Sequence, residues 1–355
     1  DLALAGDEVR VALGGAPMLE LPTLYPDARE FRRVAGTLGV RPGRLRFDAV
    51  RLFHDAFEAR IDGDVLRADD IEIVDLVIDL PRISPASPRR WLPLEGLPEK
   101  TRGWLNDALL GVERGEAAIT LFGRPRDWPE RVPPGAVDSR IEFSGLRLAY
   151  ARGWPVAEDI DGRVAFVGET MRAAAERGRV AGVTLRAPEV RIDDTRRAEI
   201  ELSLEAPATG ADRLADLADA LPLPGADAAL AAMSWSGTAS ARARIWFPVR
   251  HREDWRLVGE IGFDDSAVSF SPPGLQLRRI EGVLPFSRER LGPANFDARV
   301  GERPVALALD ARFGPDFRLE VEGSGPVPEL LPDDWLRAYP PLRARLDGRS
   351  RFSLS

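Results

Sequence analysis

Apolar and polar residues alternate along most of this chain, and this period of two constrains its fold more than any other feature. The segment "RIEFSGLRLAY" (140–150) places Ile141 and Phe143 on one side, and the phase shifts after Gly145. Side chains of a β-strand point alternately to opposite faces, so such a segment is typical of a half-buried strand. A glycine at a phase shift indicates a β-bulge or a bend.

Several other segments show the same alternation and are also predicted to be strands. They are "EIELSLE" (199–205), "WRLVGEIGF" (255–263), "VALALDARF" (305–313) and "FRLEVEG" (317–323). Breaks rich in Gly, Pro and Asp separate the segments, and the 32 glycines and 30 prolines suit many short strands joined by turns.

Helical signals are few. Apolar residues three and four positions apart predict helices over 97–110 and 211–221, and a third helix is plausible over 25–39. A short helix around 328–338 is a weaker expectation. A parallel α/β sheet would need a helix after nearly every strand, so the pattern favours a mainly β, antiparallel fold with a few short helices.

One short phrase recurs along the chain at unequal spacings. Its copies are "IDGDVLR" (61–67), "IDGRVAF" (160–166), "IEGVLPF" (280–286) and "LDGRSRF" (346–352). One interpretation places the phrase inside a strand, with the isoleucine, valine and phenylalanine on one face and the glycine leaving a gap between them. The other makes the Asp-Gly pair a hairpin turn. We favour the strand, because glycine keeps the same register after Glu281.

The recurrence predicts a structural repeat with insertions of variable length. Residues 1–90 form an N-terminal β section with a possible short helix. Residues 91–222 form the first clear repeat unit, and 223–355 a second unit that runs into a truncated third. We expect all of them to belong to one continuous sheet.

Composition excludes several functions. A net charge of −8 and a pI near 5.2 disfavour a nucleic-acid partner, which would want a basic face. The absence of cysteine excludes disulfides, zinc–thiolate sites and thiol catalysis. No run of about 18 apolar residues predicts a membrane-spanning helix. The chain begins at Asp1 within an alternating segment, and we expect it to be a piece of a longer protein.

No catalytic motif emerges from the residues that usually carry chemistry. The two histidines, His54 and His251, lie far apart and are expected at the surface or at strand edges. Acidic pairs are expected to serve turns; they are Asp69–Asp70, Asp193–Asp194, Asp264–Asp265 and Asp333–Asp334. We therefore expect no catalytic residue, no metal, no cofactor and no enzymatic activity.

Two adjacent segments carry a family resemblance. They are "RGWLNDALLGVERGEAAITLFGRPRDWP" (102–129) and "LAYARGWPVAEDIDGRVAFVGETMRAAAERGRVAGVTL" (148–185). Together they resemble the central region of the YhdP branch of AsmA-like proteins, in which a "WL..AL" helix is followed by a "Y..gWP.l.dl.g.l.f" segment. The matching positions are Trp104, Leu105, Ala108, Leu109, Tyr150, Gly153, Trp154, Pro155, Ile160, Gly162 and Phe166. The unit that follows lacks the Trp-Pro pair.

The resemblance implies a bridge-like lipid transfer protein of the Gram-negative envelope. Such proteins have a transmembrane anchor in the inner membrane, span the periplasm, and form a long curled antiparallel sheet whose inner face is an apolar groove. This chain would be a periplasmic middle section that conducts phospholipids between inner and outer membranes. The implied partners are phospholipid acyl chains, membranes contacted through other parts of the parent protein, and envelope proteins at the groove ends.

The inward register of the strands supplies the candidate lining of that groove. These residues are Ile141, Phe143, Leu146, Leu148, Val164, Phe166, Ile200, Leu202, Leu204, Leu257, Ile261, Phe263, Leu284, Phe286, Leu307, Leu309, Leu319 and Val321. Alternation favours a lipid-lined groove and a dry packed core equally, since both need apolar side chains on one face. A non-transporting envelope scaffold or an outer-membrane assembly factor is therefore the alternative. An enzyme using two of the acidic residues is a further one.

Overall fold

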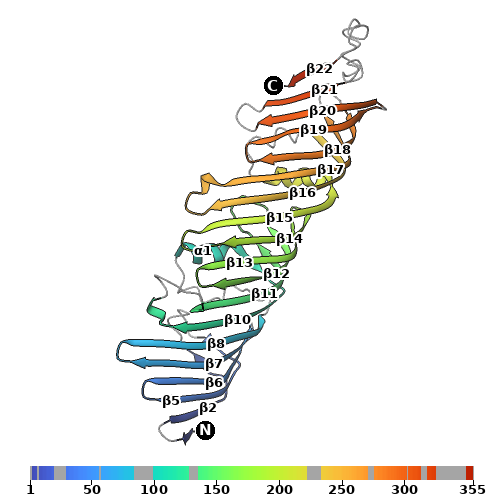
Figure 1. Ribbon diagram of the computed structural model, residues 1–355. Helices are drawn as coiled ribbons and strands as arrows, with labels where there is room; N and C mark the ends of the chain where they lie inside the picture. Colours follow the sequence, from blue (N-terminus) through green and yellow to red (C-terminus); the bar gives the residue numbers. More distant parts are fainter. Residues whose placement is uncertain are drawn as a thin grey trace. The chain divides into compact units, whose positions relative to one another are not determined.

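The chain is mainly β, with antiparallel strands and two short α-helices among the residues that the computed structural model describes (Figure 1). The described residues are 2–5, 8–19, 29–55, 57–83, 99–127, 135–221, 233–270, 276–301, 303–312, 318–324 and 349–354. The fold class predicted from the alternation, a mainly β curled antiparallel sheet, is confirmed.

The chain divides into two compact units. The first contains residues 1–152, 156–178 and 189–199, and the second contains 153–155, 179–188 and 200–355. Strands β13 (Thr170–Val180) and β14 (Val183–Ile192) contribute residues to both units, whereas β15 (Glu199–Gly210) belongs almost wholly to the second.

Most strands of the first unit pair with their neighbours in chain order, always antiparallel. They are β1 (Leu2–Ala5), β2 (Glu8–Leu13), β5 (Arg33–Arg41), β6 (Arg44–Phe53), β7 (Phe57–Ala68), β8 (Ile71–Ile83), β10 (Arg114–Gly123), β11 (Val137–Leu148) and β12 (Ala157–Val167). Two shorter elements complete the pairing: β3 (Met18–Leu19) pairs with β4 (Arg29–Glu30), and β9 (Leu109–Gly111) pairs with β11.

The second unit repeats this plan, again with antiparallel neighbours in chain order. Its later strands are β16 (Met233–Pro248), β17 (Arg256–Phe270), β18 (Gln276–Ser287), β19 (Arg290–Val300), β20 (Arg303–Arg312), β21 (Arg318–Ser324) and β22 (Arg349–Leu354). Short 3₁₀-helices lie at η3 (Pro125–Asp127) and η4 (Arg252–Asp254).

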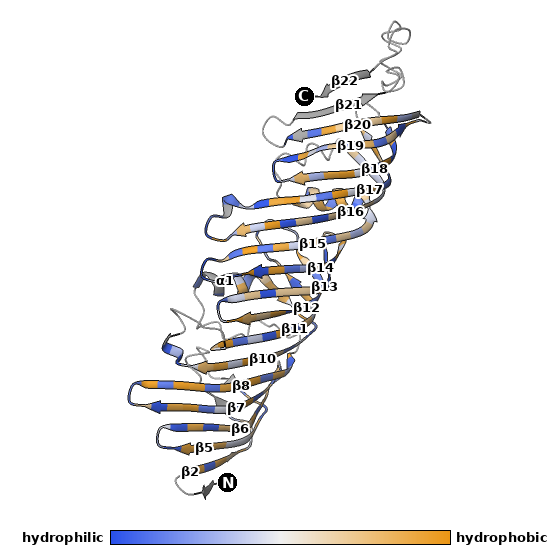
Figure 2. Cartoon of the chain, viewed as in Figure 1, coloured by the Kyte–Doolittle hydropathy of each residue, from blue (hydrophilic) through white to orange (hydrophobic). Residues whose placement is uncertain are grey.

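Cross-strand register gathers the alternating apolar residues of the first unit on one face, because residues directly opposite each other in an antiparallel pair share a face. Figure 2 shows the alternation along the strands as successive orange and blue bands. One row of opposed residues from β6 to β12 is Val50, Ile61, Ile78, Ile119, Ser139 and Phe166. A second, from β8 to β12, is Leu80, Ala117, Ile141 and Val164.

The second unit has a corresponding face. From β16 to β18 one row is Ala241, Ile261 and Leu284, and from β19 to β22 another is Ala294, Leu309, Val321 and Phe352. We call these two surfaces the apolar face of the first unit and the apolar face of the second unit. The opposite faces carry much of the charge, as the ion pair between Arg44 and Asp64 across β6 and β7 illustrates (2.6 Å).

The N-terminal end of the first unit contains a packed core. Phe31, Val34, Val50, Phe57 and Ala59 are buried together, and half-buried residues of neighbouring strands pack against them. The rings of Phe31 and Phe57 meet edge to face at 6.1 Å. This cluster anchors one end of the strands from the side of the apolar face.

Both predicted helices with strong signals are present. Helix α1 spans Glu99–Ala108, and α2 spans Ala211–Ala220 with Ala211 and Leu214 buried. Each ends earlier than its apolar periodicity suggested, because the chain enters strand β9 directly after α1 and leaves α2 in an extended conformation at Leu221.

The plausible third helix over 25–39 is wrong where the structure describes it. Residues 33–41 form strand β5, and only 25–28 lie outside the described residues. Val34, Leu38 and Val40 oppose apolar residues of β6, so pairing with that strand outweighs the local helical spacing. The short helix expected around 328–338 lies outside the described residues.

Candidate functional site

The repeated phrase lies inside strands, as the strand interpretation predicted. Its first three copies fall within β7, β12 and β18, so the Asp-Gly pair is not a hairpin turn. In each copy the glycine stands directly opposite a phenylalanine of the preceding strand. The three pairs are Phe47–Gly63, Phe143–Gly162 and Phe263–Gly282. Each glycine therefore stands opposite an aromatic residue of the preceding strand, and its missing Cβ lets the following strand approach closely, with the backbone of Asp75, the backbone of Ala174 or the ring of Phe296.

Each of these pairs is followed by the same β-bulge, in which three steps on the preceding strand match two on the phrase strand. Pairing moves from Phe47–Gly63 to Val50–Ile61, from Phe143–Gly162 to Leu146–Ile160, and from Phe263–Gly282 to Ser266–Ile280. The extra position is left-handed every time: Ala49 has φ 49°, Gly145 has φ 61° and Asp265 has φ 50°. The bulge predicted at Gly145 is confirmed, and repeated bulges bend and twist a sheet.

The aspartate of the phrase holds the bulge in the first two copies. Asp62 Oδ1 accepts a hydrogen bond from the Ala49 N–H, and Asp161 Oδ1 accepts one from the Gly145 N–H, both at 2.9 Å. Without these carboxylates, the N–H of the bulge residue would lose its acceptor. The recurring Asp-Gly pair therefore has a structural role: the acid holds the bulge and the glycine makes room beside it.

Electrostatics reinforce this arrangement. The Gly145 N–H and then the Arg177 guanidinium hold the pKa of Asp161 below its ordinary value. Arg177 lies in β13, and its Nε donates to Asp161 Oδ2 at 2.7 Å. In the first copy, the hydrogen bond from Arg60 is the largest influence on the pKa of Asp62 and lowers it.

The later copies depart from this pattern. Glu281 replaces the aspartate in β18, lies exposed, and stands opposite Asp297 of β19. Asp265 occupies the bulge itself, inside β17, so the expectation that Asp264–Asp265 lies at a turn is wrong. Of the fourth copy, 346–348 lie outside the described residues, and Phe352 in β22 stands opposite Val321.

Backbone register places most of the candidate lining residues on the two apolar faces. On the first unit's face lie Ile141, Phe143, Leu146, Leu148, Val164 and Phe166. On the second unit's face lie Leu257, Ile261, Phe263, Leu284, Phe286, Leu307, Leu309, Leu319 and Val321. Ile200, Leu202 and Leu204 in β15 are half-buried and alternate with exposed Glu199, Glu201 and Ser203.

Burial varies along both faces, and strands β11 and β12 differ from the region around Phe263. Ile141, Phe143, Val164 and Phe166 of the first unit are all half-buried. In the second unit Leu257, Phe263 and Leu284 are at most 9% exposed, and so are their neighbours Val268, Leu277, Ile280 and Phe296. The strands β11 and β12 thus present a partly accessible apolar surface, whereas the part of β17 to β19 around Phe263 packs closely.

An aromatic cluster lies within the packed region of the second unit. The rings of Trp235 and Phe263 stack at 5.3 Å with planes 7° apart, and Phe296 meets Phe263 edge to face at 5.9 Å. The indole Nε1 of Trp235 is buried and has no hydrogen-bond partner in the part of the chain that the structure describes. Alternation alone did not single out Trp235, and its place opposite Val268 is known only once the strands are paired.

Segments that carry the family resemblance contact each other or a neighbouring strand. Trp104 of α1 donates a hydrogen bond from Nε1 to the Tyr150 carbonyl at 2.9 Å, which joins the helix to the segment before β12. Burial raises the pKa of Tyr150 to about 12. In the second unit Trp154 meets Trp255 edge to face at 5.6 Å, and the Arg288 guanidinium lies 4.8 Å from the Trp255 ring centre.

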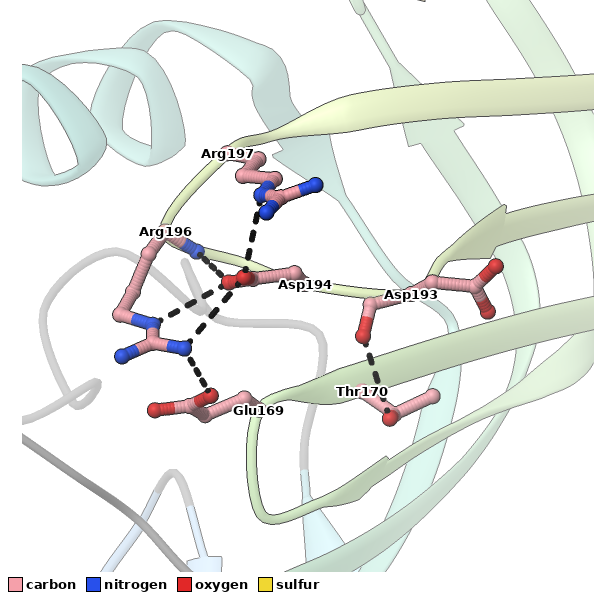
Figure 3. Close-up of polar contacts among 6 residues, drawn as sticks. All are labelled: Glu169, Thr170, Asp193, Asp194, Arg196 and Arg197. Carbon is pink, nitrogen blue, oxygen red and sulfur yellow. Dashed lines mark hydrogen bonds and ion pairs between the residues drawn. The ribbon is translucent and has the colours of Figure 1, made fainter.

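Charged residues cluster at a pair of turns of the first unit, away from strand centres (Figure 3). Arg196 contacts Glu169 at 2.7 Å and Asp194 at 3.2 Å, and Arg197 lies 3.7 Å from Asp194. The hydrogen bond from Arg196 holds the pKa of Asp194 below its ordinary value. Thr170 donates to the Asp193 carbonyl at 3.4 Å, so this acidic pair serves a turn, as predicted. The pair Asp69–Asp70 lies at the β7–β8 turn, and Asp333–Asp334 lies outside the described residues.

The two histidines occupy different settings. His54 is half-buried at the β6–β7 turn, where its ring stacks on Phe57 at 5.5 Å. His251 is exposed at η4, and its side-chain ligand atom lies within 4.8 Å of those of Glu253 and Asp254. The sequence analysis missed this trio, whose signal is "HRED". Its donors suit a divalent cation, but three exposed residues of one turn do not form a closed coordination shell.

Fold and face together define a class: a mainly β protein with repeated bulged strands, an extended apolar sheet face and a charged opposite face. No helix among the described residues is long and apolar enough to cross a membrane. The model of the YhdP protein family matches residues 6–355. The chain therefore belongs to the YhdP family, as its resemblance to that branch of AsmA-like proteins implied. No curated protein and no solved structure matches it.

Proposed function

We propose that this chain is a section of a cell-envelope protein that conducts phospholipids between inner and outer membranes along the apolar faces of its sheet. The observation that carries the proposal is the cross-strand register, which lines up apolar residues over eight successive strands of the first unit, from β2 to β12. Membership of the YhdP family supports an envelope role.

The energetics of lipid movement explain why such a face would be useful. Exposing acyl chains to water costs about 0.8 kcal/mol per methylene, so a sixteen-carbon chain faces a barrier of roughly 12 kcal/mol. An apolar face that covers the chain along its path removes most of that barrier. The half-buried side chains of β11 and β12 are suited to this contact, because they are apolar and still partly accessible.

This function needs no bond to be made or broken, and we propose that the chain is not an enzyme. We place it in the periplasm, with membrane contact through other parts of the parent protein and with envelope proteins at the ends of the lipid path. Its net charge of −8 argues against a nucleic-acid partner.

A non-transporting envelope scaffold or assembly factor is the second candidate. The observation that favours it is the close packing around Phe263, where several apolar residues of β17 to β19 are almost fully covered. A face that is packed dry along its whole length would give stiffness but no path for lipid.

Photo-crosslinking in cells separates these two functions. The full-length protein carries a photoreactive amino acid at Phe166, on the apolar face of the first unit, or at Val167, the next residue along β12. Val167 is a matched control because it is also apolar, is 46% exposed, and lies on the opposite face. A second pair, Phe286 and Glu281, makes the same comparison in β18.

The lipid-conduit proposal expects phospholipid attached at Phe166 and Phe286 but not at Val167 or Glu281. Attachment of Phe166 and Phe286 to protein segments alone, with no lipid at either, would contradict the proposal and favour the scaffold.

A further inference from the structure

Trp235 has an unusual position on the apolar face of the second unit. It lies near the start of β16, directly opposite Val268 of β17. Its indole stacks on Phe263, which in turn contacts Phe296. A large amphipathic side chain is thus held at a fixed place by aromatic and aliphatic neighbours.

The indole nitrogen of Trp235 has no acceptor among the described residues, although it is shielded from water. A buried tryptophan N–H normally finds a partner, and leaving one unpaired is costly. Even the exposed Trp104 has a partner in this chain, because its Nε1 donates to the Tyr150 carbonyl at 2.9 Å. An unsatisfied donor in a native structure calls for an explanation, and a ligand acceptor is one.

We propose that Trp235 Nε1 donates a hydrogen bond to the acyl-ester carbonyl of a phospholipid lying on the apolar face of the second unit. This inference rests on the proposed lipid-conducting function and names a lipid subsite within it. The ester carbonyl is the acceptor that directly adjoins the acyl chains, so it accompanies them onto an apolar face. Because its neighbours shield Nε1, the carbonyl reaches it when the acyl chains displace part of that cover.

The residues next to the Trp235 ring favour an uncharged acceptor over the phosphate. Val268 and Phe263 are apolar and at most 9% exposed, and a phosphate placed beside them would lose its hydration without a cationic partner. An ester carbonyl has a much smaller desolvation cost and satisfies the donor. Trp235 would therefore hold a lipid at the junction of its chains and its headgroup, whatever that headgroup is.

The test compares ester-linked with ether-linked lipid, since an ether lipid has the same chains and headgroup but no carbonyl. Purified full-length protein is incubated with vesicles of diacyl phosphatidylethanolamine or its dialkyl analogue, and lipid bound per protein is measured over a range of lipid concentrations. The wild-type protein is expected to prefer the ester lipid about fivefold, the factor that one neutral hydrogen bond of about 1 kcal/mol gives.

Trp235→Phe is expected to abolish that preference, because phenylalanine keeps a ring for stacking but lacks the N–H. The matched control is Trp246→Phe in the same strand, opposite Arg256 and on the other face, which is expected to keep the preference. If Trp235→Phe does not fold, benzothienylalanine at position 235 removes the N–H with almost no change of shape.

Equal binding of ester and ether lipids by the wild-type protein would overturn the inference, and so would an ester preference that survives in the Trp235 variant. In both of these cases lipid still binds, and the proposed function stands. Binding of neither lipid would instead contradict the proposed function itself, and the inference would fall with it.

Discussion

Two copies of the same phrase, one in β12 and one in β18, give the clearest comparison within the molecule. In both, a glycine stands opposite a phenylalanine and a bulge follows. Phe143 nevertheless remains half-buried, while Phe263 is only 9% exposed and stacks on Trp235. The acid also differs: Asp161 holds its bulge, whereas Glu281 is exposed.

The difference teaches that the phrase specifies backbone geometry and not the degree of burial. Local sequence places the bulge and the gap beside it. Whether the side chain of the phenylalanine opposite that glycine is accessible or packed depends on which side chains the neighbouring strands contribute. In the second unit they contribute Trp235 and Phe296, which close over Phe263.

Truncating the two phenylalanines should give the largest difference in unfolding free energy between the two copies. Phe263→Ala is expected to lower the free energy of unfolding by about 3–5 kcal/mol, because it leaves a cavity in a packed cluster. Phe143→Ala should cost about 1–2 kcal/mol, since its side chain is already half accessible. Urea denaturation of the purified protein measures both, and equal losses would show that the two environments are alike.

Substituting the glycine of the phrase tests whether the close approach of the neighbouring backbone matters for stability. A Cβ at Gly162 would meet the Ala174 carbonyl oxygen at 2.5 Å and Ala175 Cα at 2.7 Å. Because backbone atoms would have to move, Gly162→Ala is expected to cost about 2–3 kcal/mol. Gly111→Ala is the control, with nothing within 4 Å of its added Cβ, and should change stability by less than about 0.5 kcal/mol. Similar values for the two variants would contradict this account.

Asp161 should contribute stability that depends on pH. Asp161→Ala removes the acceptor of the Gly145 N–H, and we expect a loss of about 1 kcal/mol at pH 7. The pKa of Asp161 is lowered in the folded chain, so its contribution is complete above its unfolded pKa of about 3.9 and is lost as the pH falls through the lower, folded pKa. Unfolding measured from pH 7 down to pH 3 should therefore show the difference between wild type and variant shrinking below about pH 4. A constant difference would mean that the carboxylate charge plays no part.

Glu281→Ala should have the smallest effect and completes the comparison. Glu281 is exposed and faces Asp297 across β18 and β19, so its removal deletes no stabilising contact that the structure shows. The expected change in unfolding free energy is below about 0.5 kcal/mol. A loss as large as that of Asp161→Ala would show that the glutamate also holds its bulge.

Local patterns accounted for much of the fold and part of the candidate site. Alternation located the strands around Ile141, Leu202, Leu257, Leu307 and Leu319, and the phase shift at Gly145 located a bulge. Both features follow from geometry within one strand, which a sequence displays directly. Which residues share a face then follows from the register, provided that neighbouring strands pair in chain order, as they do here.

Features that depend on distant residues could not be predicted. Residues 33–41 have helical spacing but form a strand, because β2 and β6 offer backbone partners on both sides. The turn expected at Asp264–Asp265 is a bulge, because β16 and β18 continue past it.

Sequence alone predicted the antiparallel β class, the strand position of the repeated phrase and the apolar character of one side of each strand, because these depend on residues close along the chain. Which part of that apolar side is packed and which is accessible emerges only from the folded chain. The folded chain also shows that the indole nitrogen of Trp235 is buried, with no partner among the residues described. Burial depends on side chains brought together from strands far apart in sequence, and no local pattern records them.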